Sequence, residues 1–242
     1  MTRPDKNNST GIYIHIPFCA SKCPYCDFYS LNDTSLSESY VKALINDIKT
    51  FKGIEEFTGK KEEKPKASTV YFGGGTPSLL GEEKISEILC AVKESFFLSE
   101  DAEITLECNP STPDTEKLFA GVKKAGVNRI SLGMQSAVNE ERKLLGRKAD
   151  SERVKFCVEK ARETGFDNIS LDVMLGIPKQ TKESLKYTLD FALSLGVPHI
   201  SAYILKLEEG TFFYKNQNRL NLPDEDLTAD MYIYMCDYLE KA

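Results

Sequence analysis

Short runs of apolar and β-branched residues recur along the chain, separated by longer stretches in which apolar residues follow helical spacing. Six such runs predict strands at residues 11–18, 68–75, 103–110, 129–136, 168–178 and 199–205. Apolar residues three and four positions apart at 41–48 and 85–96 predict amphipathic helices between them. The chain therefore alternates strand and helix, and a last amphipathic helix carries Leu227, Met231 and Met235.

Capping residues and glycines mark the expected helix boundaries. Thr112 and Pro113 predict the N-cap and first residue of a third helix, and Asp224 predicts the N-cap of the last one. Glycine favours the left-handed backbone with which many helices end. Helices are expected to stop at three such positions, Gly126, Gly165 and Gly196. The charged segment 52–67 predicts an exposed connection.

The alternation of elements predicts an α/β fold. The predicted strands are apolar on both faces, which is typical of a parallel sheet covered by helices. Right-handed crossovers wind such a series either into an open sheet or toward a barrel, and periodicity leaves both arrangements open. No linker composition or internal repeat divides the chain. In either arrangement, chemistry is expected at the carboxyl ends of the strands.

Composition narrows the class of function. The chain has 242 residues, of which 41% are hydrophobic and 28% charged, as in ordinary globular proteins. Its net charge of -6, without a basic stripe, argues against nucleic-acid binding, because affinity for the phosphate backbone comes mainly from clustered lysine and arginine. The polar N-terminus and the absence of a long apolar run predict a cytoplasmic protein without stable membrane insertion.

Three of the seven cysteines, Cys19, Cys23 and Cys26, are clustered directly after the first predicted strand. The reducing cytoplasm keeps thiols free, so clustered thiols are typical of a metal or redox site. A structural zinc ion prefers four protein ligands, whereas a cubane iron–sulfur cluster held by three thiolates leaves one iron open for a substrate. The other cysteines are expected to be packing residues, namely Cys90, Cys108, Cys157 and Cys236.

Glycines and polar residues occur near the ends of the later predicted strands. The second strand ends in a run of glycines followed by Thr76, the third carries Glu107, the fourth Gln135 and the fifth Asp172. Because the carboxyl ends of parallel strands meet at one edge, we expect these side chains to lie beside the cysteine loop. Taken singly, each could also be a polar residue at a strand end that binds no ligand.

The spacing Cys-x3-Cys-x2-Cys, with Tyr25 directly before Cys26, resembles the signature of the radical S-adenosylmethionine superfamily. Further segments extend the resemblance over nearly the whole chain: YIHIPFC, VYFGGGTPS, ITLECNP, NRISLGMQS, LLGR, LDVMLGIPKQT and HISAYILKLEEGT. Together they resemble the oxygen-independent coproporphyrinogen III oxidase family, and within it the HemW branch of haem chaperones. The resemblance implies a partial (βα)6 TIM-like barrel of parallel strands.

In that family the three cysteines ligate one 4Fe–4S cluster per chain, and its open iron chelates the methionine part of S-adenosylmethionine. The resemblance implies this role for Cys19, Cys23 and Cys26. It also implies cofactor contacts from nine other residues, which are Tyr13, Tyr25, Gly74, Gly75, Thr76, Glu107, Gln135, Arg147 and Asp172. Acids suit the ammonium and ribose hydroxyls of this ligand, and Arg147 suits its carboxylate.

Two features favour the chaperone branch over the oxidases. Oxidases usually carry a cysteine two residues after the last ligand, where this chain has Phe28, and a long N-terminal extension, whereas here 18 residues precede Cys19. One feature departs from the branch, because the histidine usual near position 149 is missing from segment 148–150. The family's C-terminal domain is also expected to be absent, so that residues 1–242 form the core domain alone.

Three hypotheses follow. The first is a HemW-like haem chaperone core that holds the cluster and S-adenosylmethionine, carries haem as cargo, and meets an electron donor and haem-accepting proteins. The second is a radical enzyme that oxidatively decarboxylates the propionate side chains of coproporphyrinogen III to give protoporphyrinogen IX. The third is a non-enzymatic zinc or structural module. The sequence leaves open whether the chain is an enzyme.

Overall fold

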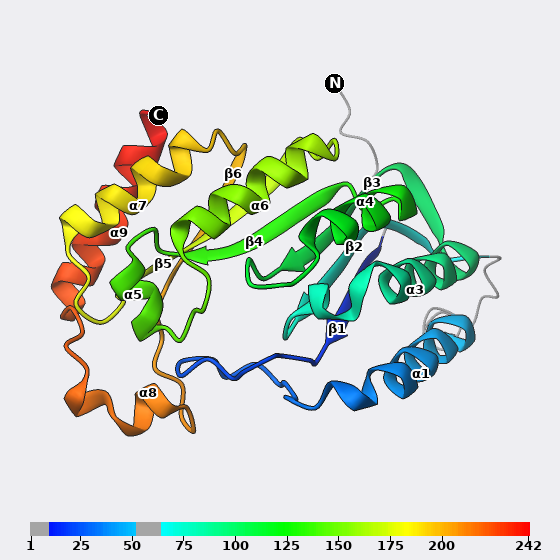
Figure 1. Ribbon diagram of the computed structural model, residues 1–242, viewed down its shortest axis with the longest axis horizontal. Helices are drawn as coiled ribbons and strands as arrows, with labels where there is room; N and C mark the ends of the chain where they lie inside the picture. The colour runs from blue at the N-terminus through cyan, green and yellow to red at the C-terminus, as the bar shows by residue number, and fades with distance from the viewer. Residues whose placement is uncertain (1–9, 52–63) are drawn as a thin grey trace.

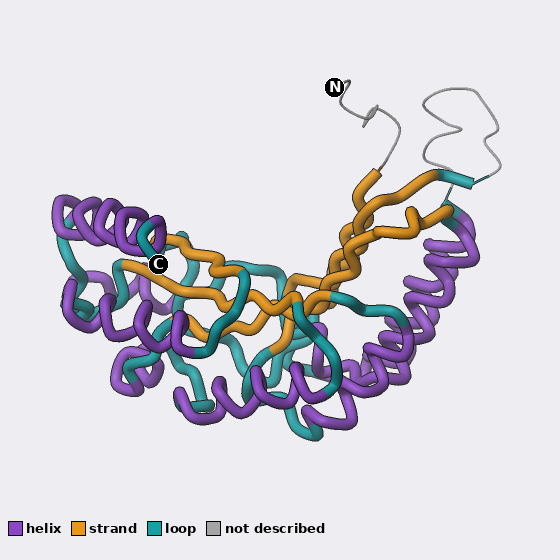
Figure 2. The backbone as a smooth tube through the Cα atoms, turned by 90° about the horizontal axis from the view of Figure 1, so that it is seen from above, coloured by secondary structure: helices purple, strands orange, loops and turns teal. Residues whose placement is uncertain are grey.

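Six parallel strands form one sheet that curls into a half-barrel (Figures 1 and 2). The computed structural model describes residues 10–51 and 64–242, so most of the predicted connection at 52–67 lies outside the described residues. The strands are β1 (Thr10–Ile16), β2 (Lys66–Gly74), β3 (Phe97–Cys108), β4 (Arg129–Gln135), β5 (Asn168–Leu175) and β6 (His199–Ile204). They lie side by side in sequence order, which confirms the predicted parallel α/β fold.

Helices follow the strands and pack along the outer side of the curved sheet (Figure 2). The α-helices are α1 (Ser37–Thr50), α3 (Gly81–Ser95), α4 (Thr115–Ala125), α5 (Asn139–Leu144), α6 (Ser151–Glu163), α7 (Lys182–Ser194), α8 (Phe212–Lys215) and α9 (Glu225–Glu240). The described residues also form three short 3-10 helices, which are η1 (Thr34–Leu36), η2 (Pro77–Leu80) and η3 (Gln217–Arg219). In the described part of the chain, no helix combines the length and apolar character needed to cross a bilayer.

The two faces of the sheet differ in chemistry. Successive side chains of a strand point to opposite faces, and on the helix-facing side they form the buried core, as Phe72, Leu106 and Leu171 show. Most of the intervening positions are polar, aromatic or glycine, and they include Tyr13, Tyr71, Glu107, Ser131, Asp172 and Tyr203. The prediction that the strands are apolar on both faces is therefore wrong, because helices cover only the outer face.

Most of the predicted helix boundaries are confirmed. Asp224 caps α9, since its carboxylate accepts a 2.7 Å hydrogen bond from the Leu227 amide. The glycines expected to end helices at 126, 165 and 196 all have positive φ angles. The prediction for Thr112 is wrong, because α4 begins later, after Asp114, and the Thr112 hydroxyl lies 2.7 Å from that of Ser78.

The four scattered cysteines divide into two pairs. Cys108 and Cys157 are buried, as expected of packing residues. Cys90 and Cys236 are exposed on the outer faces of helices, so the packing prediction is wrong for these two. Apolar neighbours in the sequence do not determine which side of a helix a residue occupies.

Shortening a buried side chain on the helix-facing side of the sheet should lower the stability of the protein. Leu106 is fully buried in β3, and we expect Leu106→Ala to lower the free energy of unfolding by about 3 kcal/mol through lost burial and a residual cavity. Ser201→Ala on the open face of β6 is the control, with an expected change within about 0.5 kcal/mol. Urea unfolding followed by circular dichroism measures both, and equal losses would contradict the one-sided core.

Candidate functional site

The cysteine loop follows β1 and is held at both ends by backbone hydrogen bonds. The Cys19 amide donates to the Leu31 carbonyl at 2.9 Å, and the Leu31 amide donates to the Pro17 carbonyl at 2.6 Å. Between these anchors Cys19, Cys23 and Cys26 are half-buried, with free thiols. The loop therefore has a fixed base while its thiols stay accessible.

The glycine end of β2 lies directly against this loop. The Gly75 amide donates to Ile16 O at 2.8 Å and the Thr76 amide to Phe18 O at 2.7 Å. A Cβ added at Gly75 would lie 2.7 Å from Phe18 O and 3.1 Å from Cys19 Sγ. The Thr76 hydroxyl also donates to Cys19 Sγ at 3.6 Å. Glycine is thus required here because only a residue without Cβ permits this close approach.

Gly74 leaves room for His15. Its φ angle of +111° is in the region that favours glycine, and an added Cβ would lie 2.6 Å from the His15 ring. His15 Nε2 lies 3.0 Å from the Tyr29 carbonyl beyond the last cysteine, so this histidine ties the loop to β1. Beside it, the ring of Tyr13 stacks on Tyr71 with centroids 6.0 Å apart, and 59% of Tyr13 remains exposed.

Two carboxyl groups face the inner side of the sheet. Glu107 accepts a 2.7 Å hydrogen bond from the Tyr71 hydroxyl, and Asp172 accepts one of 3.2 Å from Ser131. Burial raises the pKa of Glu107. Burial, followed by the charge of Glu107, raises the pKa of Asp172 to about 7. Both carboxyl groups are therefore harder to ionise than in water, and a cationic ligand beside them would favour their charged forms.

Arg147 and Gln135 lie on the other side of the site. Arg147 Nη2 donates to the Tyr25 hydroxyl in the cysteine loop at 2.7 Å, while its buried Nε has no hydrogen-bond partner among the described residues. Gln135 is 2% exposed and accepts from the Tyr203 hydroxyl. A Cβ added at Gly133 would lie 3.4 Å from Gln135 Nε2 and 3.5 Å from Arg147 Nη1, so both side chains border the same glycine.

The predicted residues thus form two groups, the carboxyl groups of Glu107 and Asp172 and the pair Gln135 and Arg147, with the cysteine loop beside them. Tyr25 and Thr76 bring the loop into contact with Arg147 and with the end of β2. Three hydroxyl groups of the site were not predicted from the sequence, namely those of Tyr71, Ser131 and Tyr203. The alternation of side chains along a strand could have predicted them, because each of these three residues lies on the inner face of its strand.

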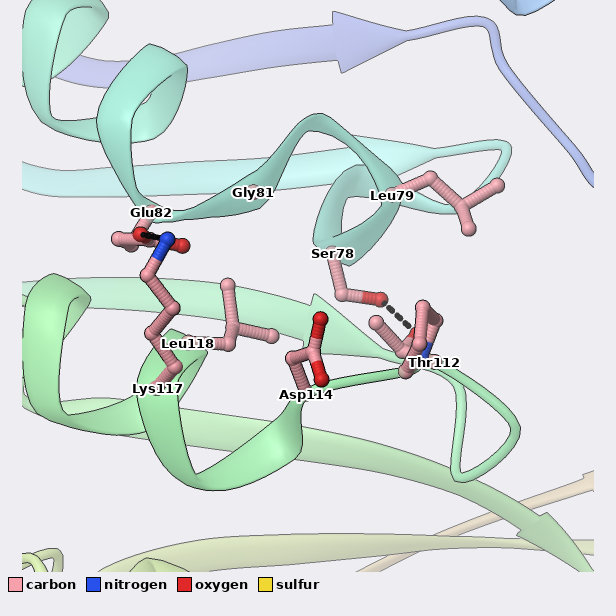
Figure 3. A pocket seen from close by; sticks show the side chains of 9 residues that line it. Ser78, Leu79, Gly81, Glu82, Thr112, Asp114, Lys117 and Leu118 are labelled. Carbon is pink, nitrogen blue, oxygen red and sulfur yellow. Dashed lines mark hydrogen bonds and ion pairs between the residues drawn. The ribbon is translucent and has the colours of Figure 1, made fainter.

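The described residues form two shallow hollows near this edge of the sheet. One of about 130 Å³ lies between η2 and the start of α4, where the Ser78 and Thr112 hydroxyls pair and Lys117 pairs with Glu82 (Figure 3). Four of its polar side chains therefore pair with one another, and the carboxylate of Asp114 lies beside them. The other, of about 260 Å³, is lined by residues that include Cys23, Cys26 and Phe212. The larger hollow therefore adjoins the cysteine loop.

The chemistry of the donor set fits an iron–sulfur cluster. Three thiols on one loop are the ligands that a cubane cluster with one open iron takes, whereas a structural zinc ion takes four protein ligands. The unpartnered Nε of Arg147 likewise suits a carboxylate, which an arginine binds through paired donors.

The raised pKa of Asp172 predicts a pH dependence of stability. The pKa of Asp172, about 7 in the folded protein, exceeds its value in the unfolded chain. Protonated Asp172 therefore favours the folded state at low pH, and this contribution to the free energy of unfolding is lost as the pH rises through 7. Between pH 5 and 8 the wild type should lose about 2 kcal/mol more than Asp172→Asn, which cannot ionise. Urea unfolding at both pH values measures this, with Glu152→Gln on α6 as control. Parallel losses in wild type and Asp172→Asn would contradict it.

Comparison with known proteins agrees with this geometry. The chain is 38% identical over 232 residues to the heme chaperone HemW of Lactococcus lactis and 37% identical over 224 residues to that of Escherichia coli. These alignments cover 95% and 92% of this chain but 58% and 57% of the relatives, so the chain spans little more than half their length.

A solved structure gives the same fold. Coproporphyrinogen III oxidase (HemN) from Escherichia coli, described as a radical SAM enzyme, superposes with a TM-score of 0.82 at 27% identity over 97% of this chain and 53% of its own. The archaeal Elp3 of Methanocaldococcus infernus, at 18% identity and a TM-score of 0.64, shares the fold. The profile of the radical SAM superfamily matches residues 13–192. This chain belongs to the radical SAM superfamily.

Proposed function

We propose that Cys19, Cys23 and Cys26 hold one 4Fe–4S cluster whose fourth iron is open to S-adenosylmethionine. The anchored loop and its half-buried thiols support this proposal. When bound, the cluster would supply the electron for reductive cleavage of the sulfonium, as in other members of the superfamily. The observation that carries the proposal is the contact of this loop, through Tyr25, with Arg147, whose buried Nε lacks a hydrogen-bond partner among the described residues.

We further propose how the chain holds S-adenosylmethionine. Arg147 would bind the carboxylate, and Glu107 and Asp172 would accept from the ammonium and the ribose hydroxyls. The remaining predicted contacts, Tyr13, Tyr25, Gly74, Gly75, Thr76 and Gln135, lie around the same edge of the sheet. A cationic sulfonium would also offset the mutual repulsion of the two carboxylates.

The cellular role that we propose is haem binding and transfer in the cytoplasm, as a HemW-like chaperone core. Similarity to several heme chaperones over more than nine-tenths of this chain supports it. Haem would be the cargo, with an electron donor for the cluster and haem-accepting proteins as partners. The likeness to HemN favours porphyrinogen oxidation as the second candidate. Phe28, at the position where oxidases usually carry a cysteine, argues against that candidate.

Replacement of one cysteine in the loop should abolish the cluster and leave the fold. Wild-type protein reconstituted anaerobically should contain about four iron and four sulfide per chain, and Cys23→Ala should contain almost none, with an unchanged circular dichroism spectrum. Cys90→Ala, an exposed cysteine on α3, is the matched control and should behave as wild type. Wild-type iron content in Cys23→Ala, or stoichiometric zinc in place of iron, would contradict the assignment.

Two measurements on reconstituted protein distinguish haem binding from porphyrinogen oxidation. Electron paramagnetic resonance of the reduced cluster should change when S-adenosylmethionine is added, because the ligand occupies the open iron. Haem titration followed by absorbance should then saturate near one haem per chain, without consumption of coproporphyrinogen III under reducing conditions. Turnover of the porphyrinogen without haem binding would favour the oxidase, and an unaltered resonance signal would contradict S-adenosylmethionine binding.

A further inference from the structure

A second arginine, Arg142, lies behind the candidate site and is 1% exposed. It belongs to the short helix α5, and three backbone carbonyls accept its hydrogen bonds. Nη1 donates to Met134 O and, at 3.0 Å, to Ser136 O, and Nε donates to Ala149 O at 2.7 Å. A guanidinium presents donors in a rigid fork, so it can join carbonyls of separate segments in a way that a lysine cannot.

The first two carbonyls flank Gln135. This residue has a φ angle of +71°, a left-handed conformation that costs a residue with a side chain about 1 kcal/mol or more and persists only where its surroundings enforce it. Hydrogen bonds to the carbonyls immediately before and after Gln135 supply that enforcement. The amide side chain is consequently held toward Tyr203 on the inner face of the sheet.

The third carbonyl, that of Ala149, lies at the end of the turn that carries Arg147. The Arg147 amide donates to the carbonyl of Arg142 at 2.9 Å, and Gly146 turns the chain with a φ angle of +72°. The bond from Arg142 Nε to Ala149 O then fastens the far side of the same turn. The Arg142 side chain is therefore bonded on both sides of Gln135 and, through Ala149, just beyond Arg147, while the main-chain carbonyl of Arg142 accepts from the Arg147 amide.

A contribution to the stability of the fold does not by itself explain an arginine at position 142. Burial lowers the pKa of Arg142 to about 10, with a further contribution from the charge of Arg147, so the protein keeps a positive charge where burial and a neighbouring like charge disfavour it. Its Nη2 is buried and finds no partner in the described segments of the chain. Buried charges with unused donors are costly, and in some proteins such groups fix one arrangement of the segments that they join.

We propose that Arg142 is a positioning residue for cofactor binding, because it fixes Gln135 and Arg147 in one arrangement before the ligand arrives. The inference rests on the proposed binding of S-adenosylmethionine at this edge. Arg142 is not itself one of the predicted cofactor contacts and acts through the two segments that it joins. Among the described residues its side chain hydrogen-bonds to Met134, Ser136 and Ala149 and not to the cysteine loop, so its loss should change ligand affinity while the loop keeps its cluster.

The test compares Arg142→Lys with Arg153→Lys in anaerobically reconstituted protein. Arg153 is a matched control on α6, because it also joins backbone carbonyls, those of Pro110 and Thr112, at 3.0 and 3.2 Å. Both variants should retain wild-type iron and sulfide and lose similar amounts in Tm. Only Arg142→Lys should weaken S-adenosylmethionine binding, by about tenfold to a hundredfold, as measured by titration of the resonance change.

A double-mutant cycle with Gln135→Ala separates positioning from general destabilisation. If Arg142 acts partly through Gln135, the effect of Arg142→Lys on affinity should shrink at least threefold in the Gln135→Ala background. Additive effects, or an unchanged affinity in Arg142→Lys alone, would overturn the positioning role while the cofactor site stands. Failure of the cluster-loaded wild type to bind S-adenosylmethionine would instead overturn the proposed function, and this inference with it.

Discussion

The parallel pairing of all six strands is the constraint on which the rest of this structure depends. Parallel neighbours require a crossover between them, and right-handed crossovers place the helices on one side of the curved sheet. The carboxyl ends of the strands then meet at a single edge. Residues as far apart in sequence as Tyr25 and Arg147 can hydrogen-bond only because of that arrangement.

The close backbone contact between the cysteine loop and the end of β2 places the candidate site at this edge. Glycine at position 75 admits the carbonyl of Phe18, and glycine at 74 admits the ring of His15. Both contacts are made by the chain itself, so the glycines shape the loop even without a ligand. The same absence of side chains leaves backbone free to approach a ligand, which is the use that the superfamily resemblance implies.

Charge inside the half-barrel is arranged in two unbalanced groups. Glu107 and Asp172 lie close enough for one to raise the pKa of the other. Buried Arg142 and half-buried Arg147 are neighbours, and each has a buried nitrogen without a partner among the described residues. A ligand that carries a cationic sulfonium and a carboxylate would complement both groups. The like charges in each group destabilise the free protein, and the proposed ligand would offset this cost by pairing with both groups.

The sequence by itself determined most of the elements and their parallel α/β class, and its cysteine spacing indicated the cluster site that we propose. Strand runs, helix spacing and the cap at Asp224 are local features, and cysteine spacing needs no fold to be read. Tertiary structure decided which face of each strand stayed polar, that Cys90 and Cys236 lie outside the core, and that Thr112 pairs with Ser78 rather than capping α4. It also decided the roles of Tyr71, Tyr203 and Arg142, because their partners lie on other strands and turns. Contacts between segments distant in sequence depend on how the sheet curls, and no local pattern encodes that curvature.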